Sequence, residues 1–287
     1  MNLSNAQNSH PLSKDSFQII RMAINKRFGI LFGDGDRYLL ENRLTARLMD
    51  LQMGDFNEYA EFIGNGQTNG QEMDTAIELL TNNETYFFRE DYQLRAFLDE
   101  LLPVLHAKNR RHRQLTIWSA GCSSGEEVYS IAIFIEESGL FNGWDIRVFG
   151  SDINSKMLSR ARQAHFSRSA FRTTPEYLKM KYFHRRDTEW ELDKGVRERC
   201  SFSKINLLDS GRTGMLGKFD VIFCRNVLMY FDRQSRVNTI DLFHRRLNTA
   251  GYLLLGHSES LFNQETPFVQ VELTDAMVYQ KREDAFA

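Results

Sequence analysis

The chain has 287 residues, more than the roughly 100 to 200 that one domain usually contains, so two structural units are expected. Hydrophobic residues make up 42% of the sequence and charged residues 26%, a balance that excludes disordered and fibrous proteins. The net charge of −2 excludes an overall basic field that would attract nucleic acid or anionic lipid.

Cysteine usage and apolar runs indicate the compartment. Three cysteines, an odd number spread widely along the chain, favour a reducing environment over a disulfide framework. The polar start lacks the apolar core of a secretory signal, and no apolar run approaches the ~20 residues of a membrane helix. We therefore expect a cytoplasmic protein without direct membrane insertion, in which residues 1–14 form a flexible tail.

Residues 15–82 have the periodicity of a small all-helical domain. Its charge is divided sharply, because residues 14–47 carry seven basic and four acidic residues, whereas residues 50–84 carry eight acidic and no basic ones. Arg43 and Arg47 share one helix face and are candidates for docking an acidic partner, although solvated helix faces that compensate each other explain the same pattern. Apolar residues recur at three- and four-residue steps, which aligns them on one face of each helix: Phe17, Ile20, Ile24 and Phe28, then Leu40, Leu44, Leu48 and Leu51.

Residues 83–110 are expected to form a linker and the start of a second domain, which continues over residues 111–287. Strands alternating with helices predict parallel pairing with right-handed crossovers, hence a doubly wound, mostly parallel α/β sheet. Only two residues separate the last two strands, so these should form an antiparallel hairpin at the sheet edge. The expected strands are 115–121, 146–152, 201–208, 219–226, 250–259, 268–273 and 276–282.

A block at about residues 165–200 interrupts this alternation. It combines an expected short helix at 173–183 with an expected strand pair that turns at Asp193–Gly195. We interpret the block as a small inserted β-subdomain.

Ligands of open α/β sheets bind beyond the carboxyl ends of the strands, where the strand order reverses. The first strand ends in SAGCSSGEE, in which Gly121 and Gly125 let a ligand approach the backbone closely. The loop lacks both the G-x-G-x-x-G cradle and the P-loop lysine, and it places Glu126 and Glu127 where a pyrophosphate would sit. The two acids favour a cationic ligand such as S-adenosylmethionine, in which Glu127 would bind a positive group. Acids in the first turn of a helix also stabilise the helix by interacting with its dipole, so a purely structural role is an alternative.

The ends of the later strands carry further candidates. Asp152 ends the second strand, where a carboxylate can accept both hydroxyls of a ribose, although an ordinary turn Asp is an equal alternative. Asn206 ends the next strand, and its amide can meet an adenine edge with a donor and an acceptor. Arg225, Asn226 and Tyr230 follow the next apolar strand and are expected at the same edge of the sheet.

Distinctive motifs are spread over almost the whole chain from about residue 15: NNETYFFRE (82–90), WSAGCSSGEEVYSIA (118–132), SDIN (151–154), INLL (205–208), FDVIFCRNVLMYF (219–231) and GYLLLGHSE (251–259). Together these motifs resemble the methyltransferases of chemotaxis receptors of the CheR type. The resemblance implies transfer of a methyl group from S-adenosylmethionine, which becomes S-adenosylhomocysteine, to glutamate carboxylates on the cytoplasmic helices of methyl-accepting chemoreceptors.

Residue roles follow from the positions that match the family's motifs. Arg89 and Tyr230 match the pair that the family places nearest the transferred methyl, and we expect them to be catalytic. Arg43 and Arg47 match positions on a helix thought to face the receptor, although relatives can carry further arginines there that this chain lacks. The resemblance implies cofactor contacts from Asn83, Thr85, Arg89, Glu127, Asp152, Asn206, Leu207, Arg225 and Asn226.

The block at 165–200 matches a β-subdomain that binds a peptide from the receptor's C-terminus in some members of the family. In this chain the turn region is shorter and lacks their Gly-rich loop, so we expect an enzyme that works independently of that peptide.

Two other functions fit parts of the sequence. A nucleic-acid methyltransferase shares the sheet but commonly carries N/D-P-P-Y after the fourth strand, where this chain has Cys224-Arg225-Asn226-Val227. An adaptor that binds S-adenosylmethionine without turnover would not need Arg89 and Tyr230. The scattered His and Cys residues have no metal-ligand spacing, so no metal site is expected.

Overall fold

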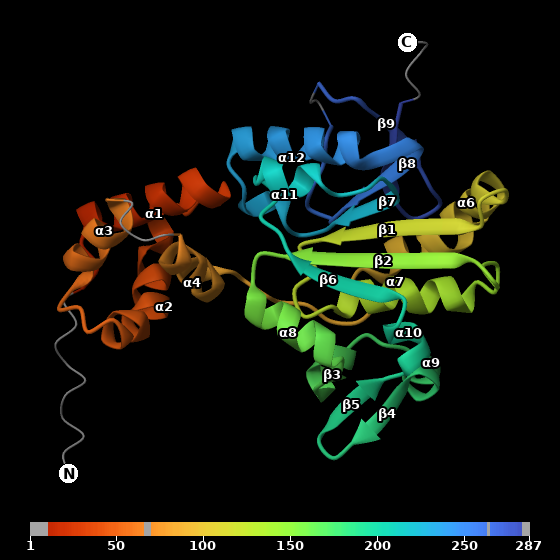
Figure 1. Cartoon of the computed structure of the whole chain (residues 1–287), viewed down its shortest axis with the longest axis horizontal. Helices are drawn as coiled ribbons and strands as arrows, with labels where there is room; N and C mark the ends of the chain where they lie inside the picture. Colours follow the sequence, from red (N-terminus) through yellow and green to blue (C-terminus); the bar gives the residue numbers. More distant parts are fainter. Residues whose placement is uncertain (1–10, 66–69, 263–264, 283–287) are drawn as a thin grey trace. The chain divides into compact units, whose positions relative to one another are not determined.

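A computed structural model of the chain describes residues 11–65, 70–262 and 265–282 (Figure 1). The chain divides into two compact units, Met1–Asn82 with Tyr230–Arg236, and Asn83–Met229 with Val237–Ala287. Most of the predicted flexible tail at 1–14 lies outside the described residues. Its last part is not a loose tail, because Leu12 is buried and Ser13 caps the first helix.

The first unit is helical, as its periodicity predicts. The expected apolar faces form its core, in which Ile20, Ile24, Leu40 and Leu44 are fully buried. Gly29 ends the first helix in the left-handed conformation, with φ 71°. The helices are α1 (Lys14–Phe28), η1 (Asp34–Asp36), α2 (Arg37–Asp50), α3 (Phe56–Gly64) and α4 (Gln71–Leu80).

The segment Tyr230–Arg236 belongs to this helical unit. The backbone N–H of Leu31 donates to the carbonyl of Tyr230 at 2.8 Å, and Asn25 Nδ2 donates to Asp232 Oδ2 at 2.6 Å. The main chain of Tyr230, which the sequence places after an apolar strand of the sheet, is therefore held by residues of the helical unit.

The second unit is built on a seven-stranded sheet with the order β6-β2-β1-β7-β8-β10-β9. Strand β10 is antiparallel to β8 and β9, whereas the pairs β6-β2, β2-β1, β1-β7 and β7-β8 are parallel. The predicted mostly parallel sheet with a C-terminal antiparallel hairpin is confirmed. Its strands are β1 (Gln114–Ala120), β2 (Asp145–Asp152), β6 (Cys200–Lys204), β7 (Phe219–Cys224), β8 (Leu247–Leu255), β9 (Phe268–Glu272) and β10 (Met277–Lys281).

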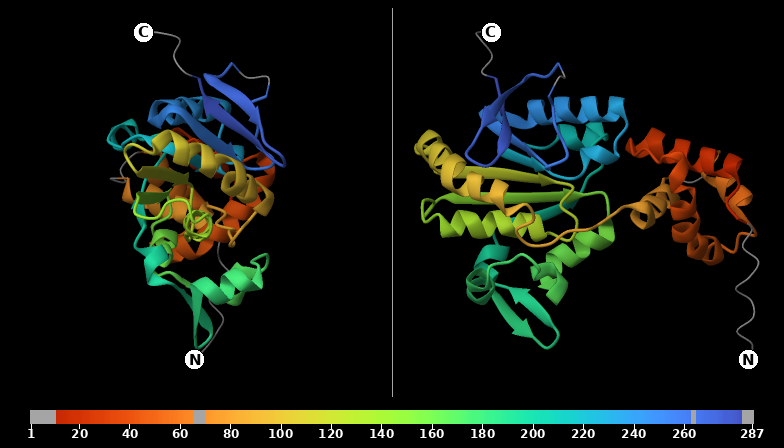
Figure 2. Two further views of the ribbon diagram at one scale, coloured as in Figure 1. Left: turned by 90° about the vertical axis from the view of Figure 1, so that its right-hand side faces the viewer. Right: turned by 180° about the vertical axis from the view of Figure 1, so that it is seen from behind.

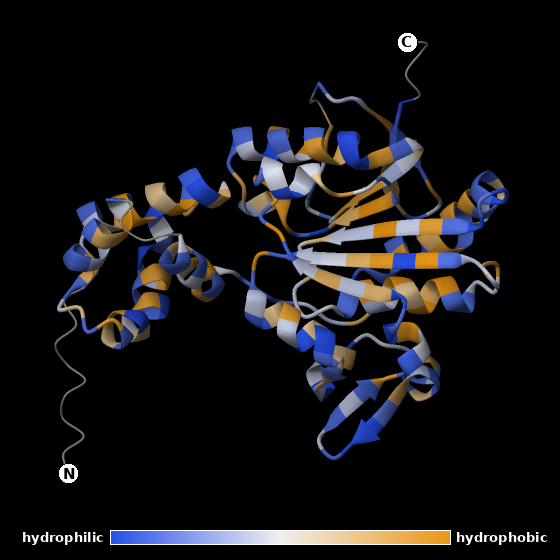
Figure 3. Cartoon of the chain, in the orientation of Figure 1, coloured by the Kyte–Doolittle hydropathy of each residue, from blue (hydrophilic) through white to orange (hydrophobic). Residues whose placement is uncertain are grey.

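Helices α6 and α7 lie behind the strands in Figure 1 and in front of them in the right-hand panel of Figure 2, so they cover one face of the sheet. Strand β7 is buried along its whole length and is largely hydrophobic in Figure 3. The helical segments before β1 are α5 (Asp91–Ala96), the π-helical η2 (Phe97–Leu101) and α6 (Leu102–Asn109). Those between the strands of the sheet are α7 (Glu126–Glu137), α8 (Ser155–Gln163), α11 (Ser210–Gly214), η4 (Leu228–Tyr230) and α12 (Arg233–Arg246).

The inserted subdomain contains a three-stranded sheet with the order β3-β5-β4. The expected turn at Asp193–Gly195 is wrong. The hairpin turns instead near Asp187, which has φ 48°, because pairing Phe183 with Leu192 buries both side chains. The elements are β3 (His165–Phe166), η3 (Arg168–Phe171), α9 (Glu176–Tyr182), β4 (Phe183–Arg186), β5 (Glu189–Leu192) and α10 (Lys194–Arg197), the last of which is capped by the side chain of Asp193.

Candidate functional site

The strand order of the second unit reverses at β1, which pairs with β2 on one side and with β7 on the other. The loops that follow these three parallel strands therefore meet at one edge of the sheet. This is the position at which open α/β sheets bind their ligands. The loops are residues 121–125, 153–154 and 225–227.

The loop after β1 is tightly folded. Gly121 and Gly125 have φ of 84° and 94°, and a Cβ atom at Gly121 would lie 2.4 Å from Cγ2 of Val227. Ser123 is also left-handed, with φ 49°, and its hydroxyl donates to the carbonyl of Asn83 at 3.1 Å. The loop therefore leaves no room for a side chain at Gly121, and it contacts the start of the segment 83–90.

Asp152 lies where the sequence predicts, at the end of β2, and is 9% exposed. Its Oδ2 accepts the backbone N–H of Ser123 and its Oδ1 accepts that of Asn154, both at 2.8 Å. These bonds fix the carboxylate at the end of β2, on the edge where the three loops meet. Asn206 and Leu207, two further expected cofactor residues, follow strand β6. Asn206 Oδ1 accepts the backbone N–H of Leu208 at 3.1 Å, and Leu207 is nearly buried.

Arg225 joins two carboxylates in the wall of this edge. Its side chain is 2% exposed, Nη1 lies 3.2 Å from Glu127 Oε2, and Nη2 lies 3.1 Å from Glu90 Oε2. Nη2 also donates to the carbonyl of Arg89 at 2.6 Å. The guanidinium of Arg225 is therefore engaged with protein groups in this structure, and its expected contact with the cofactor stays a prediction.

The two carboxyls respond differently to this environment. Burial raises the pKa of Glu127 above its usual value, although the charge of Arg225 and a hydrogen bond from Ser119 act against that rise. Burial also acts to raise the pKa of Glu90, but the charge and hydrogen bond of Arg225, together with hydrogen bonds from the His257 N–H and the Asn226 amide, leave the pKa below its usual value. Arg225 therefore favours the ionised form of both groups.

Glu90 and Glu259 were not identified as site residues from the sequence. Glu259 accepts four backbone N–H groups, those of Asn226 and Gly256 at Oε2 (2.7 and 2.9 Å) and those of Val227 and Met229 at Oε1 (2.9 and 3.1 Å). Asn226 is held there with φ 59°. Glu259 thus fixes the loop after β7, and the motif GYLLLGHSE that contains it was the signal available.

We expect Glu259→Gln to lower the free energy of unfolding of the second unit by about 1 to 3 kcal/mol, because the amide NH₂ cannot accept hydrogen bonds and leaves backbone N–H groups unpaired. Urea unfolding followed by tryptophan fluorescence measures this change, since Trp118, Trp144 and Trp190 all lie in the second unit. Stability equal to that of the unmodified protein would contradict the role of Glu259.

Glu126 offers a test of burial at the start of α7. Burial raises the pKa of Glu126, and its carboxylate accepts the hydroxyl of Ser124. A carboxyl with a raised folded-state pKa adds stability that is complete below its unfolded pKa, about 4.3, and is lost as the pH rises through the folded value. We therefore expect Glu126→Gln to be more stable than the unmodified protein at pH 7.

That difference should vanish below about pH 4, where the unfolded and folded carboxyls are both protonated. Urea unfolding at a series of pH values measures it. The matched control is Asp99→Asn, at an exposed position, and an equal rise in stability at pH 7 there would exclude burial as the cause.

Arg89 and Tyr230, the expected catalytic pair, are each described in their own unit. In the second unit, Arg89 Nη1 donates to the carbonyl of Glu84 at 3.0 Å, and the guanidinium carbon lies 5.8 Å from the centroid of the Tyr86 ring. Thr85 lies in the same segment. In the first unit, Tyr230 is 38% exposed.

Arg43 and Arg47, the expected docking residues, make contacts within the first unit. Arg43 Nη1 donates to the carbonyls of Leu80 and Thr81 at the end of α4, both at 2.9 Å. Arg47 Nε lies 3.1 Å from both carboxylate oxygens of the buried Glu72. These bonds give both arginines a structural role, and docking by them stays a prediction.

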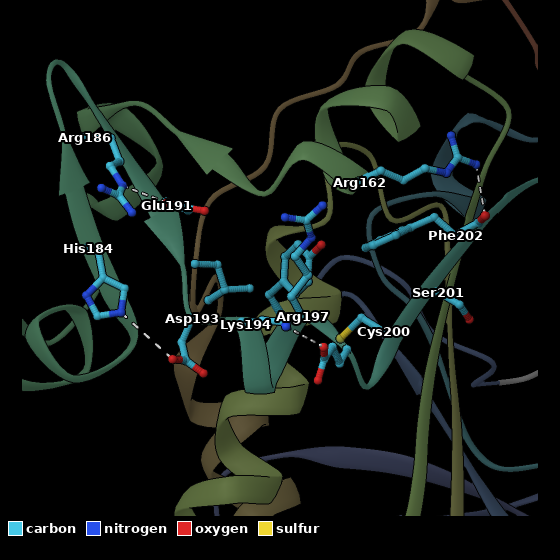
Figure 4. A pocket seen from close by; sticks show the side chains of 13 residues that line it. Arg162, His184, Arg186, Glu191, Asp193, Lys194, Arg197, Cys200, Ser201 and Phe202 are labelled. Carbon is cyan, nitrogen blue, oxygen red and sulfur yellow. Dashed lines mark hydrogen bonds and ion pairs between the residues drawn. The ribbon is translucent and has the colours of Figure 1, made fainter.

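A pocket of about 780 Å³ lies at the inserted subdomain, between β4, β5, α10 and the edge strand β6 (Figure 4). Its charges are largely paired with one another, as in Arg186 with Glu191 at 2.8 Å and Lys194 with Glu198 at 3.6 Å. The strand ends, where the three loops meet, therefore remain the candidate site.

Among residues 11–65, 70–262 and 265–282, no group of three or more His, Cys, Asp and Glu side chains is placed to hold a metal ion. None of the helices described is long and apolar enough to cross a membrane.

Comparison with known proteins identifies the family. Residues 83–277 match the family described as CheR methyltransferase, SAM binding domain, and residues 15–81 match CheR methyltransferase, all-alpha domain. Chemotaxis protein methyltransferase 2 of Vibrio cholerae serotype O1 is 38% identical over 238 residues, which cover 82% of each chain. The chemotaxis protein methyltransferase of Salmonella typhimurium is 36% identical over 260 residues, 88% of this chain and 86% of that protein.

The chemotaxis protein methyltransferase of Borreliella burgdorferi is 33% identical over 255 residues, which cover 87% of this chain and 89% of that protein. The predicted resemblance and the predicted cofactor, S-adenosylmethionine, are confirmed by these matches. The chain belongs to the CheR family of chemotaxis methyltransferases and is an enzyme that depends on S-adenosylmethionine.

Proposed function

We propose that the enzyme transfers the methyl group of S-adenosylmethionine to the side-chain carboxylate of glutamates on the cytoplasmic helices of methyl-accepting chemoreceptors, forming methyl esters. The observation that carries the proposal is the edge of the sheet, where the carboxylates of Asp152 and Glu127 lie beside the glycine loop that follows β1. Such an edge fits a cation with ribose hydroxyls and repels a phosphate.

The residues at the strand ends would hold the cofactor. In this assignment Asp152 accepts the ribose hydroxyls, Asn206 and Leu207 meet the adenine, and Glu127 faces a positive group. Asn83, Thr85 and Asn226 lie in the segments that border this edge. Arg89 and Arg225 complete the expected set. Bound S-adenosylmethionine supplies a methyl group on a positively charged sulfur.

The acceptor needs no general base. A glutamate carboxylate is ionised at neutral pH, because its unperturbed pKa is about 4.3. Its oxygen forms the new C–O bond while the S–C bond breaks and the electron pair of that bond stays on sulfur. Catalysis is then mainly alignment, which can supply about 7 to 11 kcal/mol, and we assign that task to Arg89 and Tyr230.

We further propose that the basic stretch at residues 14–47 attracts the acidic receptor helix. Since Arg43 and Arg47 are engaged within the unit, the proposal rests on the stretch as a whole and not on these two side chains alone. The enzyme would act without a receptor tail peptide, and calorimetric binding of such a peptide to the protein would overturn this part.

An acceptor panel tests the proposed function. The protein is incubated with S-adenosylmethionine labelled in its methyl group and with receptor cytoplasmic fragments, nucleic acid or no acceptor. We expect label on the receptor fragment alone, released as methanol by base, as a methyl ester requires. Label on nucleic acid would favour a nucleic-acid methyltransferase, and cofactor binding without transfer to any acceptor would favour an adaptor.

A further inference from the structure

Arg172 lies between the inserted subdomain and the segment that carries Arg89. On one side of Arg172, the carbonyl of Ala170 accepts the backbone N–H of Phe87 at 2.9 Å. On the other side, the hydroxyl of Thr173 donates to the carbonyl of Phe87 at 3.0 Å. The ring of Phe87, fully buried, stacks on that of Phe171 with centroids 5.2 Å apart. Arg172 is therefore held beside the segment 84–89 by its neighbours.

Two guanidinium groups share one aromatic ring at this place. The guanidinium carbon of Arg172 lies 3.7 Å from the centroid of the Tyr86 ring, and that of Arg89 lies 5.8 Å from it. The two guanidinium carbons are therefore within about 10 Å of each other. Glu84 forms an ion pair with Arg172, whose Nη2 lies 2.7 Å from Glu84 Oε1, whereas Arg89 contacts Glu84 through its backbone carbonyl.

The ion pair between Arg172 and Glu84 contributes little to the stability of the fold. Its side chains are 48% and 57% exposed, and exposed ion pairs contribute only about 0 to 1 kcal/mol. The segment is already fixed by the two backbone bonds of Phe87 and by its buried ring. An exposed cation beside the residue assigned to align the reacting carboxylate is better placed to meet an acidic substrate.

We propose that Arg172 binds a second acidic side chain of the substrate helix, one turn away from the glutamate that is methylated, and that Glu84 competes with that side chain for Arg172. The inference rests on the proposed function. Side chains three or four positions apart on a helix have Cβ atoms about 5 to 6 Å apart. Two such acidic side chains can therefore reach two guanidinium groups that both lie near the Tyr86 ring.

Two substitutions test the proposal through opposite effects. Arg172→Ala should weaken binding of a glutamate-rich receptor helix peptide to the protein loaded with S-adenosylhomocysteine by about fivefold, the effect of one exposed ion pair. Glu84→Gln should strengthen that binding by a similar factor, because the internal competitor is gone. In turnover with receptor fragments, the same changes should appear in KM, while kcat and the cofactor Kd stay unchanged.

The matched control is Arg168→Ala, which removes an exposed charge from the same subdomain and should leave binding unchanged. Replacing the second glutamate of the peptide by glutamine should abolish the effect of Arg172→Ala. Changes of the same sign in Arg172→Ala and Glu84→Gln, no change in either, or no binding of any acidic helix would overturn the inference. The methyl-ester assay decides the proposed function separately, since it needs only the unmodified protein.

Discussion

Replacing Arg225 with methionine is expected to lower the free energy of unfolding of the second unit by about 3 to 5 kcal/mol, the usual cost of leaving partners of a buried ion pair without their counter-charge. Arg225 is 2% exposed and lies between Glu127 and Glu90. Methionine keeps an unbranched apolar chain but carries no charge, so both carboxylates would lose their shared cation. Urea unfolding followed by tryptophan fluorescence measures the loss in this unit.

The controls separate charge from packing. Arg95→Met removes a cation paired with Asp91 at the surface of α5, and its effect should stay below about 1 kcal/mol. Adding Glu90→Gln and Glu127→Gln to Arg225→Met should recover part of the lost stability, because the unpaired charges are then absent. A loss below about 1 kcal/mol in Arg225→Met would show that the network is not a buried charge cluster in solution.

Arg89→Ala is expected to lower kcat about a hundredfold, the usual effect of removing one oriented donor from a reacting group. The cofactor Kd should change much less, because Asp152 and Glu127 remain in place. Steady-state kinetics with receptor fragments give kcat, and calorimetry with S-adenosylhomocysteine gives the Kd. Arg89 lies next to Glu90, whose carboxylate is held by Arg225, so its backbone position should survive the substitution.

Arg95→Ala is the matched control for Arg89→Ala, since it removes an exposed arginine of α5 in the same unit, and it should leave kcat unchanged. Turnover by Arg89→Ala equal to that of the unmodified protein would remove the alignment role. A parallel loss of cofactor binding and turnover would instead make Arg89 a cofactor residue only.

The fold was predictable where local pattern decides it. Alternating strands and helices gave the parallel sheet, and the two-residue connection gave the antiparallel pair β9 and β10. The subdomain turn was not, because Asp193–Gly195 and Asp187 both have turn chemistry, and the choice depends on burial of Phe183 against Leu192.

The site was predictable only in its outline. Asp152 and the glycine loop follow from strand ends and glycine positions near them in sequence. Glu90 and Glu259 could not be assigned roles, since they bind groups 135 and 33 residues away along the chain. In the same way, helical periodicity placed Arg47 on a polar face but could not show that Glu72 of another helix meets it there.

Mass spectrometry of a receptor cytoplasmic fragment after incubation with the enzyme and S-adenosylmethionine tests the central claim most directly. The fragment is digested and the modified residue is located by fragmentation of the peptide, with a sample treated with base alongside. The account predicts a methyl group on glutamate side chains that disappears on base treatment. A stable methyl group on a nitrogen or sulfur atom of the fragment, or an unmodified fragment, would contradict it.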